Sequence, residues 1–183
     1  MELELKHLAP YLPYGLKVQL SQKGIFNLDE EFPQPHNEIC EITNILKCNN
    51  EWQVEISEVA GDDSFGLIDL DEIMPLLLPM SSLYTEMEDG KVPIVELAKI
   101  EHPCSTYHIL RNKVVEVAGN NQDSMSFKYD LDDNYFINSN FDCDDEYYPI
   151  MYQLDLFTYL FSHHFDVFGL IDKGLALDKT KIK

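Results

Sequence analysis

Apolar and polar residues alternate along several short stretches of this chain, and a two-residue period is typical of β-strands with one buried face. In the segment 51–56, Trp52, Val54 and Ile56 share one face, while acidic or amide side chains occupy the other. The preceding segment 39–47 is also rich in apolar and β-branched residues. We therefore expect a β-hairpin in which 39–47 pairs with 52–57 and an acidic face points outward.

The same reasoning predicts further strands and two short helices. Residues 16–20 are expected to be extended, 106–110 to pair with 114–118, and 125–129 to pair with 135–138. A helix over 3–12 is expected to end at Pro13. A second helix is expected over 93–100, with Pro93 at the first position, where proline is tolerated.

The strongest helical pattern lies near the C-terminus, over residues 149–164. Large apolar residues recur there at helical spacing, at Ile150, Leu154, Phe157, Phe161 and Phe165. A helix this apolar is either central to the core or partly covered by a partner. Together with the strands, and without any internal repeat, it predicts one α+β domain over residues 1–183. In that domain a small, mostly antiparallel sheet packs against an apolar C-terminal helix.

The net charge of the chain adds more to this predicted fold than the rest of its composition does. The chain has 183 residues with 33 acidic and 13 basic side chains, which give a formal net charge of −20. Its 45% hydrophobic residues are enough for a folded core, so the charge indicates an acidic surface rather than disorder. Arg111 is the sole arginine. Because phosphate and anionic membranes are bound through clustered Lys and Arg, we expect no direct nucleic-acid or membrane binding.

The acidic residues are concentrated in two stretches without a Lys or Arg, from Lys47 to Lys91 and from Lys128 to Lys173. In the second stretch tyrosines and phenylalanines are interleaved with the acids, and aromatic side chains can anchor a contact to which charge steers a partner. The alternative is that these acidic stretches are solvated loops without a binding role. The predicted partner-binding residues, ranked with the second stretch first, are Tyr129, Asp130, Asp132, Asp133, Tyr135, Asp142, Asp144, Asp145 and Glu146, and then Glu51, Glu55, Asp69 and Asp71.

Motifs that carry chemistry are missing. The sequence contains no GxGxxG, GxxxxGK[ST], GxSxG or HExxH, so we expect no enzyme and no cofactor. The segment from Asp130 to Asn134 begins like a calcium loop, but Tyr135 stands where that loop needs glycine. His102, Cys104 and His108 do not complete a zinc tetrahedron, so we read them as packed residues and predict no metal site.

The N-terminus is acidic and interrupted by prolines, unlike a signal peptide, and no apolar run is long enough to span a bilayer. These features predict a cytoplasmic protein.

Four segments carry a resemblance: LAPYLPYGLKVQ at 8–19, MPLLLPMSSLYTEM at 74–87, GKVPIVELAKIE at 90–101 and HFDVFGLIDKGLALD at 164–178. In this order they resemble small proteins of unknown function carried by phages and mobile elements of Bacteroidetes-type bacteria. The resemblance implies a bacterial host cytoplasm and a phage-related role, and it brings no catalytic motif.

Small acidic proteins of such elements sometimes inhibit host defence, and RNA-guided effectors have strongly basic guide channels. The resulting hypothesis is an anti-CRISPR-like inhibitor that binds a basic, RNA-handling nuclease or its guide complex. The alternative is a non-enzymatic accessory or structural protein of the element, possibly homo-oligomeric through the C-terminal helix.

Overall fold

The computed structural model describes residues 2–21, 39–49, 51–58, 64–119, 124–140 and 147–182. Contacts divide the chain into two compact units: unit 1 comprises Met1–Pro79 and Phe161–Lys183, and unit 2 comprises Met80–Leu160. The expected single domain stays a prediction, because compactness does not measure whether the two units unfold together. Within the described ranges, no helix has the length and apolar character required to cross a bilayer.

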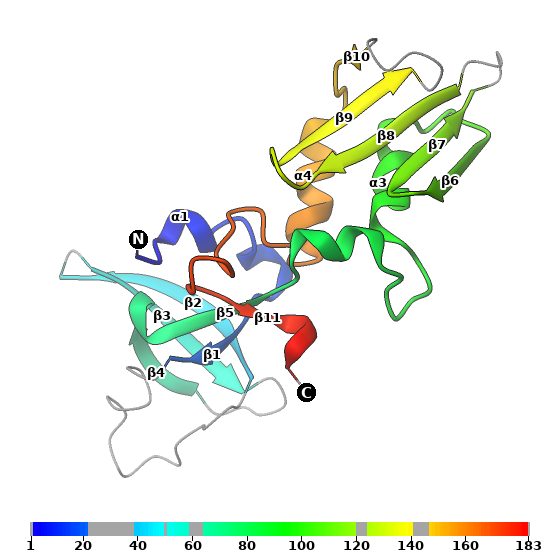
Figure 1. Cartoon of the computed structure of the whole chain (residues 1–183). Helices are drawn as coiled ribbons and strands as arrows, with labels where there is room; N and C mark the ends of the chain where they lie inside the picture. The colour runs from blue at the N-terminus through cyan, green and yellow to red at the C-terminus, as the bar shows by residue number, and fades with distance from the viewer. Residues whose placement is uncertain are drawn as a thin grey trace. The chain divides into compact units, whose positions relative to one another are not determined.

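Unit 1 is built on a six-stranded sheet with the order β11-β5-β1-β2-β3-β4 (Figure 1). All its strand pairs are antiparallel except that of β11 with β5. Its described elements are α1 (Leu5–Leu8), η1 (Leu12–Tyr14), β1 (Lys17–Leu20), β2 (Cys40–Cys48), β3 (Glu51–Glu58), β4 (Ser64–Asp69), η2 (Leu70–Glu72), β5 (Ile73–Leu77), β11 (Leu177–Asp178) and η4 (Lys179–Lys181).

The core of unit 1 joins both ends of the chain. Leu8, Val54 and Leu170 are completely buried in one cluster, and burying each such side chain stabilises the fold by about 1.5–3 kcal/mol. The Tyr11 hydroxyl, also buried, donates to the Phe165 carbonyl at 2.7 Å and accepts from the Val167 N–H at 3.3 Å. Residues 154 positions apart are thereby tied together.

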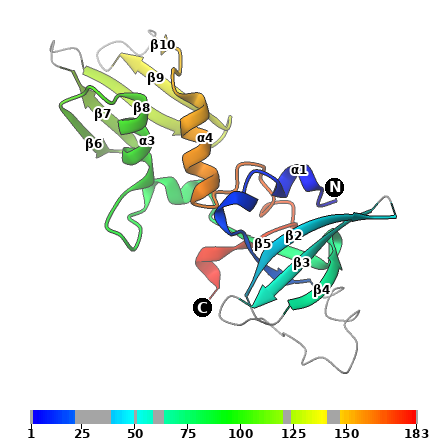
Figure 2. The same cartoon turned by 180° about the vertical axis from the view of Figure 1, so that it is seen from behind.

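Unit 2 contains a five-stranded antiparallel sheet with the order β10-β9-β8-β7-β6. Helices α3 and α4 lie on the same face of this sheet (Figures 1 and 2). Its described elements are η3 (Met80–Tyr84), α3 (Pro93–Glu101), β6 (Tyr107–Arg111), β7 (Val114–Ala118), β8 (Ser124–Asp130), β9 (Tyr135–Asn140), β10 (Tyr147–Tyr148) and α4 (Gln153–Ser162).

The structure confirms a mostly antiparallel α+β fold, and it divides the strands between two sheets where the sequence indicated one. The three expected hairpins are present as β2–β3, β6–β7 and β8–β9. The expected N-terminal helix is much shorter: α1 ends at Leu8, just before Pro10, whose ring cannot continue a helix. Gly15, at φ 67°, then turns the chain out of η1 into β1.

Helix α4 is less buried than its apolar sequence suggests. Leu156 and Leu160 are completely buried, whereas Leu154 is 80% exposed. The exposed side continues into the preceding segment, where Tyr147 and Met151 are 68% and 73% exposed. The helix therefore contributes to the core through one narrow stripe.

Candidate functional site: an acidic groove in unit 1

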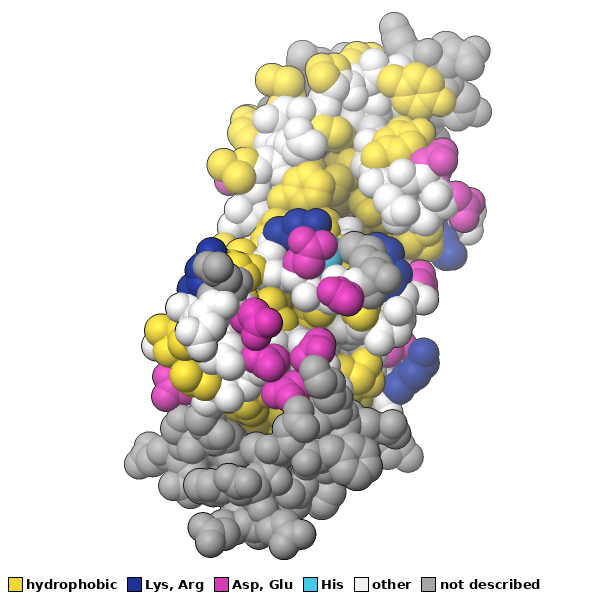
Figure 3. All heavy atoms as spheres, turned by 90° about the vertical axis from the view of Figure 1, so that its left-hand side faces the viewer, with side chains coloured by type: hydrophobic (Ala, Val, Ile, Leu, Met, Phe, Trp, Pro, Cys, Tyr) yellow, Lys and Arg dark blue, Asp and Glu magenta, His cyan; other side chains and the backbone are white. Residues whose placement is uncertain are grey.

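A groove of about 590 Å³ in unit 1 brings together three segments that are distant in sequence. They are the N-terminal segment 2–6, the start of β3 and the turn from β4 into η2. Figure 3 shows acidic side chains gathered on the side of unit 1 that this groove occupies. We call it the acidic groove; its lining residues are Glu2, Leu3, Glu4, Leu5, Lys6, Glu51, Trp52, Asp69, Leu70 and Asp71.

Charge in the groove is strongly one-sided, with five carboxylates against one ammonium group. That ammonium, on Lys6, donates to Glu4 at 2.9 Å, and both side chains are mostly exposed. The hydrogen bond from Lys6 is the largest cause of a lowered pKa at Glu4. Most of the negative charge in the lining therefore has no lysine or arginine partner within the lining itself.

The carboxylate of Asp69 is held in place by its neighbours. Asp69 and Glu72 form a reciprocal capping box at η2, in which Glu72 accepts from the Asp69 N–H at 3.1 Å. The Gln53 side-chain amide donates to Asp69 at 2.9 Å from the paired strand β3. Since both strands are part of a sheet, this edge of the groove is fixed before any partner arrives.

Trp52 gives the groove an aromatic wall. Val54 and Ile56 of the same strand face are completely buried, but Trp52 lies near the strand end and remains 39% exposed. The Lys47 ammonium lies 5.5 Å from the centre of its ring. An indole that already attracts one cation offers a surface suited to basic side chains.

Three carboxylates near the groove come close enough to share a cation. Oxygen atoms of Asp69, Asp71 and Glu72 lie within 4.8 Å of one another. Two of these residues form the capping box described above, which accounts for their proximity without an ion. We assign no metal to this cluster.

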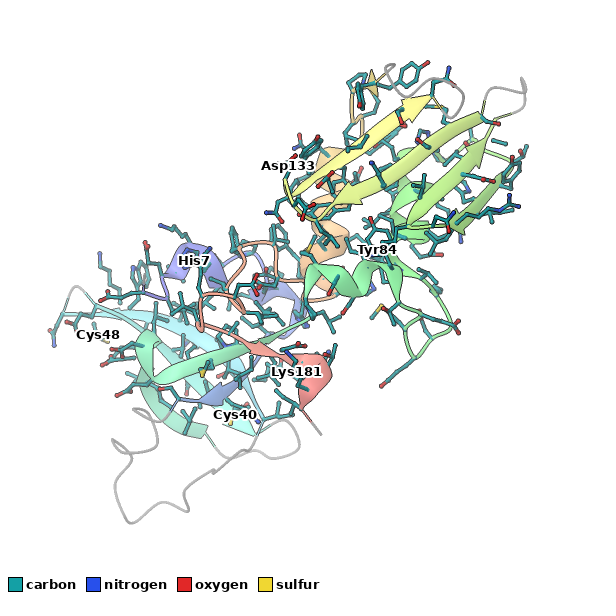
Figure 4. The ribbon with its side chains drawn as sticks, viewed as in Figure 1. His7, Cys40, Cys48, Tyr84, Asp133 and Lys181 are labelled. Carbon is teal, nitrogen blue, oxygen red and sulfur yellow. The ribbon has the colours of Figure 1, made fainter. Side chains whose placement is uncertain are left out.

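The first-ranked acidic residues of the sequence lie in unit 2, at the turn between β8 and β9, where Figure 4 labels Asp133. The Asp130 carboxylate accepts from the N–H groups of Asp132 and Asp133 at 3.0 and 3.1 Å, so its first role is to close the turn. Asp130 and Asp132 line a pocket of about 250 Å³ together with Lys113 and Lys128. The local charge is mixed rather than uniformly acidic.

Tyr129 is part of the core, because the alternation of β8 turns its side chain inward. It is 7% exposed, and its ring packs edge-on against Phe136 with 4.9 Å between ring centres. Its backbone N–H and carbonyl both bond to the hydroxyl of Tyr84, which is labelled in Figure 4. Tyr129 therefore presents little area to a partner, whereas Tyr135 is 50% exposed.

The other predicted residues divide into three groups. Glu51, Asp69 and Asp71 line the acidic groove. Glu55 lies farther along β3, opposite Leu67, and is not part of the lining. Asp142, Asp144, Asp145 and Glu146 lie outside the described residues.

The sequence reasoning missed Glu2 and Glu4. Their alternation with Leu3 and Leu5 is the strand-like signal that could have found them, because it places the leucines inward and the acids outward. The structure follows that pattern: Leu3 is 7% exposed, and Leu5 packs against the core.

No protein-family model, curated protein or solved structure matches this chain.

Proposed function

We propose that this chain is a binding protein that holds a basic protein partner in the acidic groove. The observation that carries the proposal is the set of five carboxylates around an exposed tryptophan, opposed within the lining by Lys6 alone. Charge of one sign steers a basic partner to the groove, and the aromatic wall supplies apolar contact area that charge cannot.

The partner class we propose is a basic, RNA-handling effector of host defence, and the consequence of binding is its inhibition. The groove carboxylates gather several negative charges on one surface, as a nucleic-acid strand does with its phosphates. Acidic residues from a strand end and its neighbouring turn can therefore compete for a channel built to hold nucleic acid. The resemblance to phage and mobile-element proteins supports the same partner class.

The test is a binding measurement between the full chain and a purified RNA-guided nuclease from a Bacteroidetes-type host, with and without its guide. The double variant Glu51→Lys/Asp71→Lys reverses two exposed charges in the groove. We expect it to weaken binding about tenfold or more, equivalent to at least about 1.4 kcal/mol. Binding of the unaltered chain should also weaken as salt rises through the physiological range.

The matched control is Asp132→Lys/Asp133→Lys, which changes the net charge equally at exposed positions of unit 2. It should leave most of the affinity intact. An equal loss in both double variants would show that net charge, and not the groove, drives binding. Unchanged binding in the groove variant would refute the groove as the site.

A second candidate function is self-association through the apolar segment 147–154. Met151 and Leu154 are 73% and 80% exposed, which is unusual for large apolar side chains close together in one segment. Light scattering at several salt concentrations separates the two candidates, because an apolar contact between copies persists at high salt. Leu154→Ser should abolish such association while leaving Leu156 and the core stripe in place.

A further inference from the structure

Unit 2 contains a cavity of about 310 Å³ whose walls differ sharply in polarity. Its polar wall is formed by Glu101 at the end of α3, His102 directly after it, and Asn138 on β9. Its apolar wall is formed by Met125, Tyr148, Pro149 and Met151. None of these residues belongs to the acidic groove.

The cavity holds two buried polar atoms without hydrogen-bond partners among the described residues. Asn138 is 3% exposed, and its Oδ1 atom makes no hydrogen bond. The Nε2 atom of His102 is buried and unpartnered as well. The Asn138 side chain acts as a weak hydrogen-bond partner that opposes the fall in the pKa of His102, but the contact does not reach full hydrogen-bonding geometry at either atom.

Such atoms call for an explanation, because a buried polar group without a hydrogen-bond partner destabilises the fold. Asn138 is fixed there by its strand: it pairs with Phe127, whose ring is completely buried on the same face of the sheet. An apolar side chain at this position would leave no amide to satisfy. The presence of asparagine at position 138 therefore indicates that a ligand donates a hydrogen bond to its side-chain oxygen.

Glu101 adds a buried negative charge. It is 4% exposed, and its two oxygens accept from the N–H groups of Met151 and Tyr152 at 2.8 and 3.1 Å. No lysine or arginine of the described chain forms an ion pair with it. A carboxylate has about four acceptor positions, so about two remain for a donor that enters the cavity.

Burial lowers the pKa of His102, although the nearby Glu101 charge acts in the opposite direction. The imidazole is therefore neutral at neutral pH, and one of its nitrogens can accept a hydrogen bond. The polar wall thus converges three kinds of acceptor: a carboxylate oxygen, an amide oxygen and an imidazole nitrogen.

We infer that this cavity binds a guanidinium group, carried by an arginine side chain of a protein partner. A guanidinium is planar and carries five N–H donors in a fixed fork, so it can meet several acceptors at once, which a lysine ammonium does less well. Its face stacks on aromatic rings, and the arginine stem packs on apolar side chains. Tyr148 and the two methionines provide that wall, and the Glu101 charge excludes anions.

This inference goes beyond the proposed function, because it places a recognition site in the other unit and names the group it takes. It remains testable if the acidic groove proves inactive. An arginine-anchoring cavity would add specificity to a basic partner, since charge attraction alone does not distinguish arginine from lysine.

The experiment titrates the full chain with N-acetyl-arginine amide while side-chain NMR resonances of Asn138 and His102 are followed. N-acetyl-lysine amide is the control ligand, and agmatine represents a free guanidinium compound. We expect saturable shifts at both residues, with the lysine compound binding at least about tenfold more weakly. Equal affinity for the two amides, or no saturable shift with arginine, would overturn the inference.

Two variants separate recognition from folding. Asn138→Leu removes the unpartnered amide at similar volume, so it should abolish arginine binding while leaving the unfolding midpoint unchanged or higher. Ser139→Ala, on the opposite face of the same strand, should leave binding unchanged. Arginine binding that survives in Asn138→Leu would contradict the proposed site. If agmatine bound and N-acetyl-arginine amide did not, an arginine side chain of a protein partner would be refuted as the source of the guanidinium group.

Discussion

The two units differ in the sequence separation of the contacts that hold them together, although in each a tyrosine hydroxyl bonds to backbone groups of another segment. In unit 1, Tyr11 bonds to a segment 154 residues away, whereas in unit 2, Tyr84 bonds to Tyr129, 45 residues away. Unit 1 needs both ends of the chain, and unit 2 is one continuous stretch. Contacts between distant segments are slow to form, so we expect unit 2 to fold first.

Electrostatics separates the units as well. In unit 1 the acidic groove has Lys6 as the one basic residue of its lining. In unit 2 the acids of the β8–β9 turn lie beside Lys113 and Lys128, and the sole arginine pairs with Glu116 at 3.5 Å. An acidic stretch in sequence becomes an acidic surface only where the fold keeps basic residues away from it.

Removal of residues 163–183 should produce the largest difference in stability between the two units. Unit 1 would lose β11 together with the completely buried Phe165 and Leu170. We expect a loss of more than about 5 kcal/mol, enough to unfold unit 1, since each large core deletion costs about 2–5 kcal/mol. Amide hydrogen exchange should show protection lost in 40–58 and retained in 93–101 and 124–140.

A chain that ends at Asp178 is the control for this truncation, because it keeps β11 and removes the exposed lysine tail. It should retain both units. If the larger truncation unfolded both units together, the chain would behave as the single domain that its sequence predicts. Survival of unit 1 would show that its core does not depend on the C-terminal segment.

The second effect concerns the two bridging hydroxyls. Tyr11→Phe should destabilise unit 1 by about 1–3 kcal/mol, because a buried carbonyl and N–H lose their partner. Tyr84→Phe should cost unit 2 less, about 1 kcal/mol, because Tyr84 is only partly buried and water can replace its hydroxyl. Exchange rates at the Val167 and Tyr129 amides measure each bridge separately.

The hydroxyls of Tyr11 and Tyr84 have different structural roles. The pairing of β7 with β8 ends before Tyr129, because the chain turns at Asn112 and Lys113, both at positive φ. The backbone groups of Tyr129 therefore bond to the Tyr84 hydroxyl where a neighbouring strand would otherwise pair with them. At Phe165, the Tyr11 hydroxyl joins two termini. An equal or larger loss for Tyr84→Phe would contradict the greater dependence of unit 1 on its bridge.

The smallest expected effect is a pH dependence shared by both units. Burial lowers the pKa of His7 and His164 in unit 1 and of His102 and His108 in unit 2 below the usual 6.5. The unfolded chain therefore binds protons at a higher pH than the folded chain. Stability should be full above about pH 6.5 and should fall as pH decreases through that value.

Urea unfolding at about pH 7.5 and about pH 5.5 measures this loss. In unit 1 the Nδ1 atom of His7 accepts the Glu4 N–H at 3.1 Å, an arrangement that requires this nitrogen to be unprotonated. His7→Gln keeps an acceptor that does not titrate, so it should reduce the pH dependence of unit 1, where His164 still titrates, and leave that of unit 2 unchanged. A flattening in unit 2 as well would contradict the assignment.

The local elements could be predicted from particular patterns. The alternation around Val54 and Ile56 identified β3, Pro93 marked the start of α3, and helical spacing located α4. The N-terminal helix was predicted too long because its apolar residues outweighed Pro10. The candidate groove was predicted only in part, since Glu51, Asp69 and Asp71 stood out as acids while Glu2 and Glu4 did not.

By itself, the sequence determined the three hairpins, the helices α3 and α4, the α+β class and the excess of acid, because each depends on composition or on a period of a few residues. It did not indicate the strands β4, β5, β10 and β11. The tertiary structure decided which acids share a surface, that Tyr129 lies inside, and that Glu101, His102 and Asn138 converge on one cavity. The physical reason is that a local pattern identifies the partner of a strand only across a short turn, whereas the pairs β1–β5 and β5–β11 join segments far apart in sequence.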